Sequence, residues 1–174
     1  MRRLILFRHA KSAWPAGVPD HERPLAKRGQ RTAPVMGAFL DRERLLPDLA
    51  LISTARRAIE TSELALAATG REIFWKEEPR LYDAPANALL TIVRETPAEI
   101  QTLMLVGHNP GMETFAVELV GNGPEPHLSR LREKFPTAGV AVIDFDTDDW
   151  TGIDHGRGAL ARFETPKSIE DSAT

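Results

Sequence analysis

The sequence predicts an α/β fold in which helices cover both faces of a mixed, mostly parallel sheet of about six strands. Short apolar runs of strand length alternate along the chain with segments of helical character. Two of these runs, Leu4–Phe7 and Thr102–Val106, are almost entirely apolar, which is typical of central strands that are buried on both faces. We therefore expect a three-layer α/β/α sandwich.

The expected elements follow from these runs and from the signals between them. The strands are expected at Leu4–Phe7, Leu49–Ile52, Glu72–Trp75, Thr102–Val106, Val140–Phe145 and Ala159–Phe163. The helices are expected at Lys27–Arg44, Ala55–Thr69, Asn87–Arg94, Pro110–Val120 and, as a short one, Pro124–Phe135. Pro34 should kink or restart the first helix, and Asn109 is a candidate N-cap with Pro110 at the first helical position.

Length and composition limit the classes of function. A chain of 174 residues fits one domain with a sizeable core, which we place at 1–166, and the polar segment 167–174 should be a frayed tail. The net charge of -3 gives no reason to expect a nucleic-acid or membrane partner. No run approaches the roughly 20 apolar residues that cross a bilayer, and the apolar run after the basic start is too short for a signal peptide.

The chain contains no cysteine. Disulfides, thiol nucleophiles and cysteine-bound zinc are therefore excluded, and the composition suits a cytoplasmic protein. Nothing in the sequence points to an oligomer, so a monomer is the default expectation. The segment Ala13–Pro24, with three prolines and one glycine, reads equally well as a loop that covers a site or as an ordinary surface connection.

Basic side chains follow three of the expected strands at the point where each strand ends. Arg8 and His9 follow the first strand, His108 follows the strand Thr102–Val106, and Arg57 lies in the first turn of the helix after Leu49–Ile52. Neighbouring strand ends converge in space in an open α/β sheet. Cations in a first helical turn oppose the helix dipole unless an anion is near; a pairing of Arg56 with Glu60 would account for Arg56 but leaves Arg57 free. The sequence therefore predicts a basic pocket for a phosphoryl group.

These motifs resemble those of the histidine phosphatase superfamily, the group named for phosphoglycerate mutase and acid phosphatases. Arg8-His9-Ala10 resembles its Arg-His-Gly signature, Ser53 to Thr61 resembles its second motif, and Gly107-His108 its second histidine motif. The short SixA-type phosphohistidine phosphatases are the most similar subgroup, on Arg23-Pro24-Leu25, on Val106 to Pro110 and on Phe135 to Ala138. The resemblance implies a phosphoglycerate mutase-like fold without a cap insertion.

The resemblance also implies roles for individual residues. His9 would be the nucleophile that forms a phosphohistidine, which water then hydrolyses, and nearby arginines should lower its pKa. Arg8, Arg57 and His108 would bind the phosphoryl oxygens, with Thr137 and Arg23 as further substrate-binding candidates. No metal or other cofactor is expected, because the arginines supply the positive charge that magnesium supplies in other phosphoryl-transfer enzymes.

The general acid is the open point of this scheme. Asn109 stands where acid phosphatases and phytases have an aspartate, and an amide cannot supply the proton. Asp83 occupies a position similar to the acid of mutase-like members, but it could equally cap the following helix; Asp20 is a weaker candidate. A weak acid would favour phosphohistidine over alkyl phosphates, because imidazole is the easier group to expel.

The expected function is therefore a phosphatase that acts on protein phosphohistidine, with a histidine-phosphotransfer domain as a possible partner. A phosphatase of small phosphorylated metabolites is the alternative enzyme, and a mutase is less favoured because few cap residues are present. A non-catalytic phosphate-binding protein on the same fold is the rival from another class. His21, His127 and His155 are expected to have no catalytic role, and two arginines beside His9 and His108 argue against a metal site.

Overall fold

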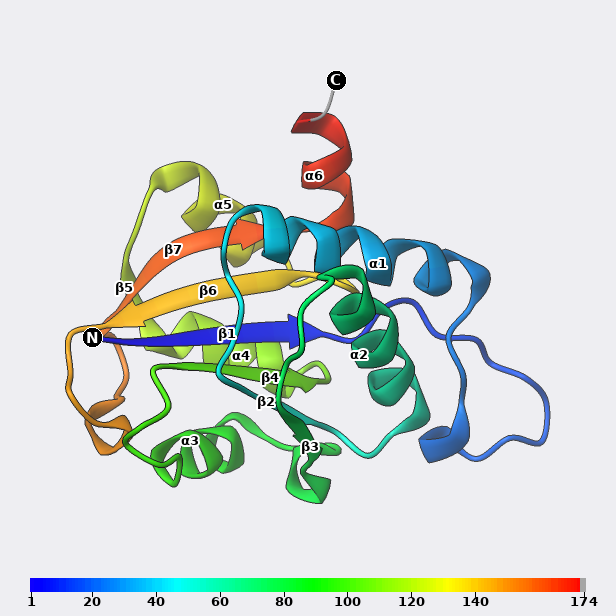
Figure 1. The fold of residues 1–174 in the computed structure, drawn as a ribbon, viewed down its shortest axis with the longest axis horizontal. Coiled ribbons are helices and arrows are strands. Elements are labelled where there is room, and N and C mark those ends of the chain that lie inside the picture. Colours follow the sequence, from blue (N-terminus) through cyan, green and yellow to red (C-terminus); the bar gives the residue numbers. More distant parts are fainter. Residues whose placement is uncertain (173–174) are drawn as a thin grey trace.

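The strands form one seven-stranded sheet in the order β3-β2-β4-β1-β6-β7-β5 (Figure 1). The structure, a computed structural model, describes residues 1–172. β1, β2, β3 and β4 run parallel, as do β5 and β7, whereas β6 is antiparallel to both its neighbours. The sheet is thus mixed and mostly parallel, as predicted. The strands are β1 (Arg2–Arg8), β2 (Leu49–Ile52), β3 (Trp75–Glu77), β4 (Thr102–Gly107), β5 (Val120–Asn122), β6 (Val140–Phe145) and β7 (Gly158–Glu164).

Helices cover both faces of the sheet and confirm the three-layer architecture. Alternate residues of β1 enter opposite cores: Leu4 and Leu6 pack with residues of α3, α4 and α5, and Ile5 and Phe7 pack with residues of α1 and α2. Burial on both faces explains why this strand is apolar throughout its centre. The helices are α1 (Lys27–Arg42), α2 (Arg56–Ala68), α3 (Ala86–Arg94), α4 (Gly111–Leu119), α5 (Glu125–Glu133) and α6 (Pro166–Ser172), with short 3-10 helices at Asp20–Glu22, Pro79–Leu81 and Trp150–Gly152.

Several elements differ from the sequence prediction. α1 runs through Pro34 without a restart, because burial of Met36, Phe39 and neighbouring side chains against α2 and the sheet outweighs one lost backbone hydrogen bond. β3 begins at Trp75 rather than Glu72, because pairing with β2 sets its register. Val120 leaves α4 and begins β5, which was not predicted.

The expected frayed tail is helical as far as residue 172. Thr165 and Ser168 cap its start reciprocally: each backbone N–H donates to the other residue's hydroxyl, at 2.7 and 3.1 Å. Ile169 packs against the core beneath α1. The expectation of a frayed tail was wrong for the part described, and residues 173 and 174 lie outside the described residues. No helix within residues 1–172 is long and apolar enough to cross a membrane.

The register of the central strands brings the predicted strand ends together. Arg8 of β1 lies opposite Gly107 of β4, and Ile52 of β2 lies opposite Val106 of β4. The residues that follow these strands are His9, His108 and Ser53, so all three leave the sheet at the same edge. This edge is where an open α/β sheet presents its ligand site.

Candidate active site

His9 is buried and is held in a neutral, oriented form. Its side chain is 6% exposed, and its Nδ1 donates a hydrogen bond of 2.8 Å to the Ala10 carbonyl oxygen. A carbonyl can only accept, so the proton of the neutral ring is on Nδ1 and the Nε2 lone pair is free. Burial, together with the charges of His108, Arg57 and Arg8, lowers the pKa of His9 to about 3.

The main chain around His9 is fixed by α2. The Ala10 N–H donates to Thr61 Oγ1 at 2.9 Å, and the Thr61 hydroxyl donates to the Arg57 carbonyl at 2.7 Å. One threonine therefore joins the loop after β1 to the first turn of α2. Arg56 pairs with Glu60 at 3.3 Å, as the sequence predicted, and Arg57 is 4% exposed and faces the site.

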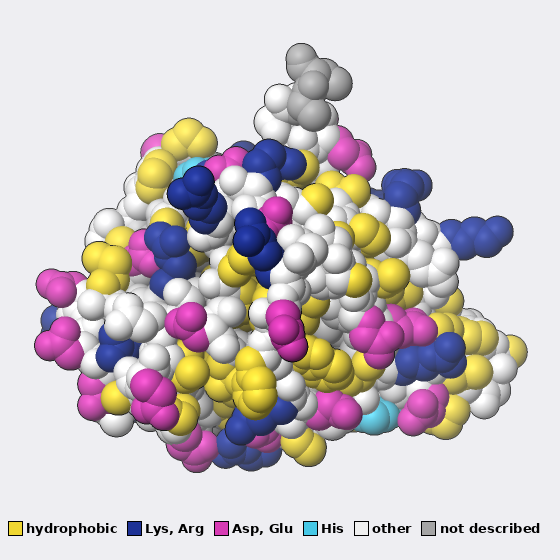
Figure 2. All heavy atoms as spheres, viewed as in Figure 1, with side chains coloured by type: hydrophobic (Ala, Val, Ile, Leu, Met, Phe, Trp, Pro, Cys, Tyr) yellow, Lys and Arg dark blue, Asp and Glu magenta, His cyan; other side chains and the backbone are white. Residues whose placement is uncertain are grey.

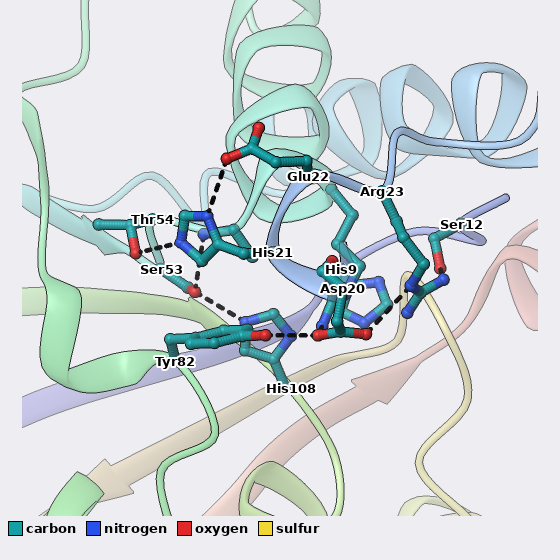
Figure 3. Close-up of polar contacts among 12 residues, drawn as sticks. His9, Ser12, Asp20, His21, Glu22, Arg23, Ser53, Thr54, Tyr82 and His108 are labelled. Atoms are coloured by element: carbon teal, nitrogen blue, oxygen red, sulfur yellow. Dashed lines mark hydrogen bonds and ion pairs between the residues drawn. The ribbon is translucent and has the colours of Figure 1, made fainter. Parts of the chain in front are cut away.

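His108 presents an unpartnered N–H beside His9, at a distance of 5.1 Å between ring centroids (Figure 3). Its Nε2 lies 2.7 Å from Ser53 Oγ, which also accepts the Ala55 N–H at 3.3 Å. Burial and the charge of Arg57 lower the pKa of His108 to about 4, so the ring is neutral. Because Ser53 Oγ already accepts the Ala55 N–H, we assign its hydroxyl as the donor to Nε2. In this tautomer the ring proton lies on Nδ1, which is buried without a partner.

Two guanidinium groups present further buried donors. Arg8 donates from Nη1 to the Phe135 carbonyl at 2.9 Å, while its Nε has no partner. Arg57 donates from both Nη atoms to Asp20, at 2.7 Å to the carbonyl and 3.1 Å to the carboxylate, and its Nε also has no partner. Buried unpaired donors are costly. Three of them from Arg8, Arg57 and His108 indicate a ligand with several acceptor oxygens, such as a phosphoryl group.

Asp20 brings the loop 13–24 over the site (Figure 3). Its carboxylate accepts hydrogen bonds from Tyr82 at 2.5 Å, from Arg57 at 3.1 Å and from Arg23 at 3.1 Å. These three donors, the tyrosine first, hold the pKa of Asp20 well below its usual range, so it is ionised at neutral pH. Of the two interpretations left open by the sequence, these contacts favour a loop that covers the site.

The remaining candidates lie farther from the donors. Arg23 binds Ser12 Oγ at 2.8 Å and the Ala13 carbonyl at 3.0 Å, and its guanidinium lies 3.5 Å from the centre of the Trp14 ring. Its connection to Arg57 runs through the Asp20 carboxylate, which accepts hydrogen bonds from both arginines. Asp83 is exposed, with φ 54°, and lines a cavity of 390 Å³ with His108. Thr137 lies outside this cavity and lines a separate groove.

Sequence reasoning missed Tyr82 and gave Ser53 no role of its own. The Tyr82 ring packs edge-on against His108, at 5.6 Å between centroids, and against His21 at 4.8 Å. His21 in turn has Nε2 2.8 Å from Thr54 Oγ1, so it lies at the rim of the site. A single tyrosine in a loop belongs to no pattern, so its role could not be predicted from the sequence. Within residues 1–172, no three His, Asp or Glu side chains are grouped so that they could hold a metal ion.

Comparison with known proteins identifies the family. The model of the histidine phosphatase superfamily (branch 1) matches residues 4–86. An uncharacterised protein of Mycobacterium tuberculosis is 37% identical over 163 residues, which cover 92% of this chain and 100% of that protein. The crystal structure of a candidate phosphohistidine phosphatase SixA of Agrobacterium tumefaciens is 34% identical with a TM-score of 0.80, covering 95% of this chain and 98% of that one.

A second candidate phosphohistidine phosphatase SixA, from Nakamurella multipartitia, is 29% identical with a TM-score of 0.76, covering 95% of this chain and 96% of that one. The chain belongs to the histidine phosphatase superfamily and is a phosphatase. Within the superfamily it is similar to the short SixA-type members, as the sequence motifs predicted.

The lowered histidine pKa values make folding stability depend on pH. A histidine whose folded pKa lies below its unfolded value, about 6.5, stabilises the fold fully above pH 6.5 and progressively less as pH falls toward the folded pKa. The free energy of unfolding should therefore fall by about 2 kcal/mol for each of His9 and His108 when the pH is lowered from 7 to 5. Urea unfolding at both pH values tests this. The drop should shrink by about 2 kcal/mol in His9→Ala, and an unchanged drop would show that His9 is not held neutral.

Ser53→Ala should lower kcat by about fivefold without preventing folding. The variant loses one hydrogen bond that fixes the His108 tautomer, and a neutral hydrogen bond is worth about 1 kcal/mol. Steady-state assays with free phosphohistidine measure the effect. Ser62→Ala is the matched control, because this buried serine of α2 donates only to the Ala58 carbonyl at 2.9 Å. Equal kcat values for the two variants would remove the role given to Ser53.

Proposed function

We propose that the protein hydrolyses phosphohistidine on a protein through a covalent phosphohistidine at its own His9. The observation that carries the proposal is the pairing of a neutral, oriented His9 with three buried, unpartnered N–H donors from Arg8, Arg57 and His108. The imidazole supplies a nucleophile, the three donors supply hydrogen bonds, and the two arginines among them supply the positive charge that a transferred phosphoryl group requires. The similarity to two structures of candidate SixA phosphohistidine phosphatases supports this choice of substrate.

The proposed reaction has two displacement steps. In the first, His9 Nε2 attacks phosphorus, a P–N bond forms to His9, and the P–N bond to the substrate imidazole breaks. The leaving imidazole takes up a proton from solvent or from a nearby acid. In the second step water attacks phosphorus, the P–N bond to His9 breaks, and phosphate leaves with the water oxygen. Nδ1–H of His9 remains bound to the Ala10 carbonyl in both steps and holds the ring in place.

The site offers few side chains that could supply a proton, which favours a substrate with a good leaving group. Asp20 is ionised because Tyr82, Arg23 and Arg57 all donate to it, so it cannot supply a proton. Asn109 carries an amide, which donates to the Phe135 carbonyl at 3.0 Å. Only Asp83 lines the cavity beside His108 as an acid candidate. Expelling an alkoxide needs a well-placed proton donor, whereas imidazole leaves more readily.

A phosphatase of small phosphorylated metabolites is the second candidate. The cavity of 390 Å³ beside His108 is in the range that small ligands occupy, and Asp83 on its wall could protonate an alkoxide. A third possibility is a binding protein that performs no turnover. The presence of His9 with a free Nε2 argues against it, because binding alone requires no nucleophile.

A substrate panel distinguishes the candidates. The protein should hydrolyse a phosphorylated histidine-phosphotransfer domain with kcat/KM at least about 100-fold above that for sugar phosphates, since a missing general acid costs a poor leaving group 10²-fold or more. Phosphate release measures both rates, and His9→Ala is the control that should abolish them. Comparable values for the two substrate classes would favour the metabolite phosphatase.

A further inference from the structure

A second, larger groove lies, like His9, at the carboxyl ends of the parallel strands. Its volume is 630 Å³, against 390 Å³ for the cavity beside His108. It is formed by the first part of α1, the end of α5, the loop that follows α5, the end of β7 and α6. The reaction described above does not use it. Its basic and acidic lining residues are Arg28, Arg130, Glu133, Lys134, Lys167 and Asp171.

The groove and the His9 site share a wall. Pro136 and Thr137 line the groove, and the next residue, Ala138, donates its N–H to the Arg8 and His9 carbonyls at 3.1 and 3.0 Å. Phe135, the residue before Pro136, accepts a hydrogen bond from the Arg8 guanidinium at its carbonyl oxygen. A polypeptide that places a phosphorylated side chain at His9 can therefore continue into the groove across this loop.

The groove is basic although the whole chain has a net charge of -3. Arg28, Lys134 and Lys167 are exposed, and the lining of the groove holds four basic side chains against two acidic ones. These three exposed residues come from three different elements, so their charges surround the groove rather than follow one helix. Arg130 is engaged by Glu164 at 3.5 Å and by the Phe163 carbonyl. In Figure 2, Lys and Arg side chains lie above α1 and beside the base of α6, with Asp and Glu side chains among them.

We propose that this groove binds an acidic segment of the phosphohistidine protein, next to the histidine that His9 dephosphorylates. The inference rests on the proposed function and adds to it the feature by which one protein substrate is selected over another. Three exposed cations on separate elements match several carboxylates along a chain better than they match one small anion. Exposed charges of this kind affect the rate at which the substrate associates, and hence KM, because they do not touch the phosphoryl group.

Two phosphohistidine peptides test the proposal. Both are phosphorylated with phosphoramidate; one carries glutamates on both sides of the phosphohistidine, and the other carries glutamines. The wild-type protein should prefer the glutamate peptide by about tenfold in kcat/KM, through KM, because each exposed ion pair adds a modest attraction. The combined variant R28E/K134E/K167E should lose this preference.

Controls separate docking from folding and chemistry. Turnover of free phosphohistidine should be unchanged in the combined variant, and in R28Q/K134Q/K167Q, which serves if charge reversal prevents folding. Lys76→Glu changes an exposed lysine on β3, the outermost strand on the side of the sheet away from β7. This variant should keep the preference. If the wild-type protein hydrolyses both peptides equally, or the combined variants keep the preference, the groove proposal is overturned and the proposed function stands. If it hydrolyses no phosphohistidine substrate, both fall.

Discussion

The site depends on the parallel pairing of β1 with β4. This register sets Arg8 opposite Gly107, and the His9 N–H extends the pairing by donating to the Gly107 carbonyl at 3.1 Å. His9 and His108 therefore leave adjacent strands at the same level, with their rings 5.1 Å apart. A slip of one residue would reverse the faces of Leu4 and Ile5, which enter opposite cores. The packing of both cores thus fixes the geometry of the two histidines.

Electrostatics around this pair follow from burial and from two arginines. Burial favours neutral imidazole, and the guanidinium charges of Arg8 and Arg57 favour it further, so His9 keeps a free lone pair well below neutral pH. Asp20 balances part of this charge by binding Arg57 and Arg23 through one carboxylate. The loop is thereby joined to α2 and to Tyr82. His9 stays neutral, while Arg8 and Arg57, which face the phosphoryl group, stay cationic.

The fold and the central residues of the site could be predicted from the sequence because both depend on strand ends. Buried strands are visible as apolar runs, and the residues after them must converge at one sheet edge. Contacts between loops leave no such pattern. Tyr82 lies next to the predicted Asp83, yet only the structure shows its hydroxyl on Asp20, 62 residues away in sequence. Likewise, the bond between Ser53 and His108 spans 55 residues, and β5 is too short to be recognised.

Trapping the covalent intermediate tests whether His9 Nε2 is the nucleophile. The protein is mixed with phosphoramidate, quenched in alkaline denaturant, and examined by phosphorus NMR and by mass spectrometry of the peptide that contains residue 9. We expect a phosphoryl group on Nε2 of His9 and none on the His9→Ala variant. A phosphoryl group on Nδ1 or on another residue, or turnover that persists in His9→Ala, would contradict this assignment.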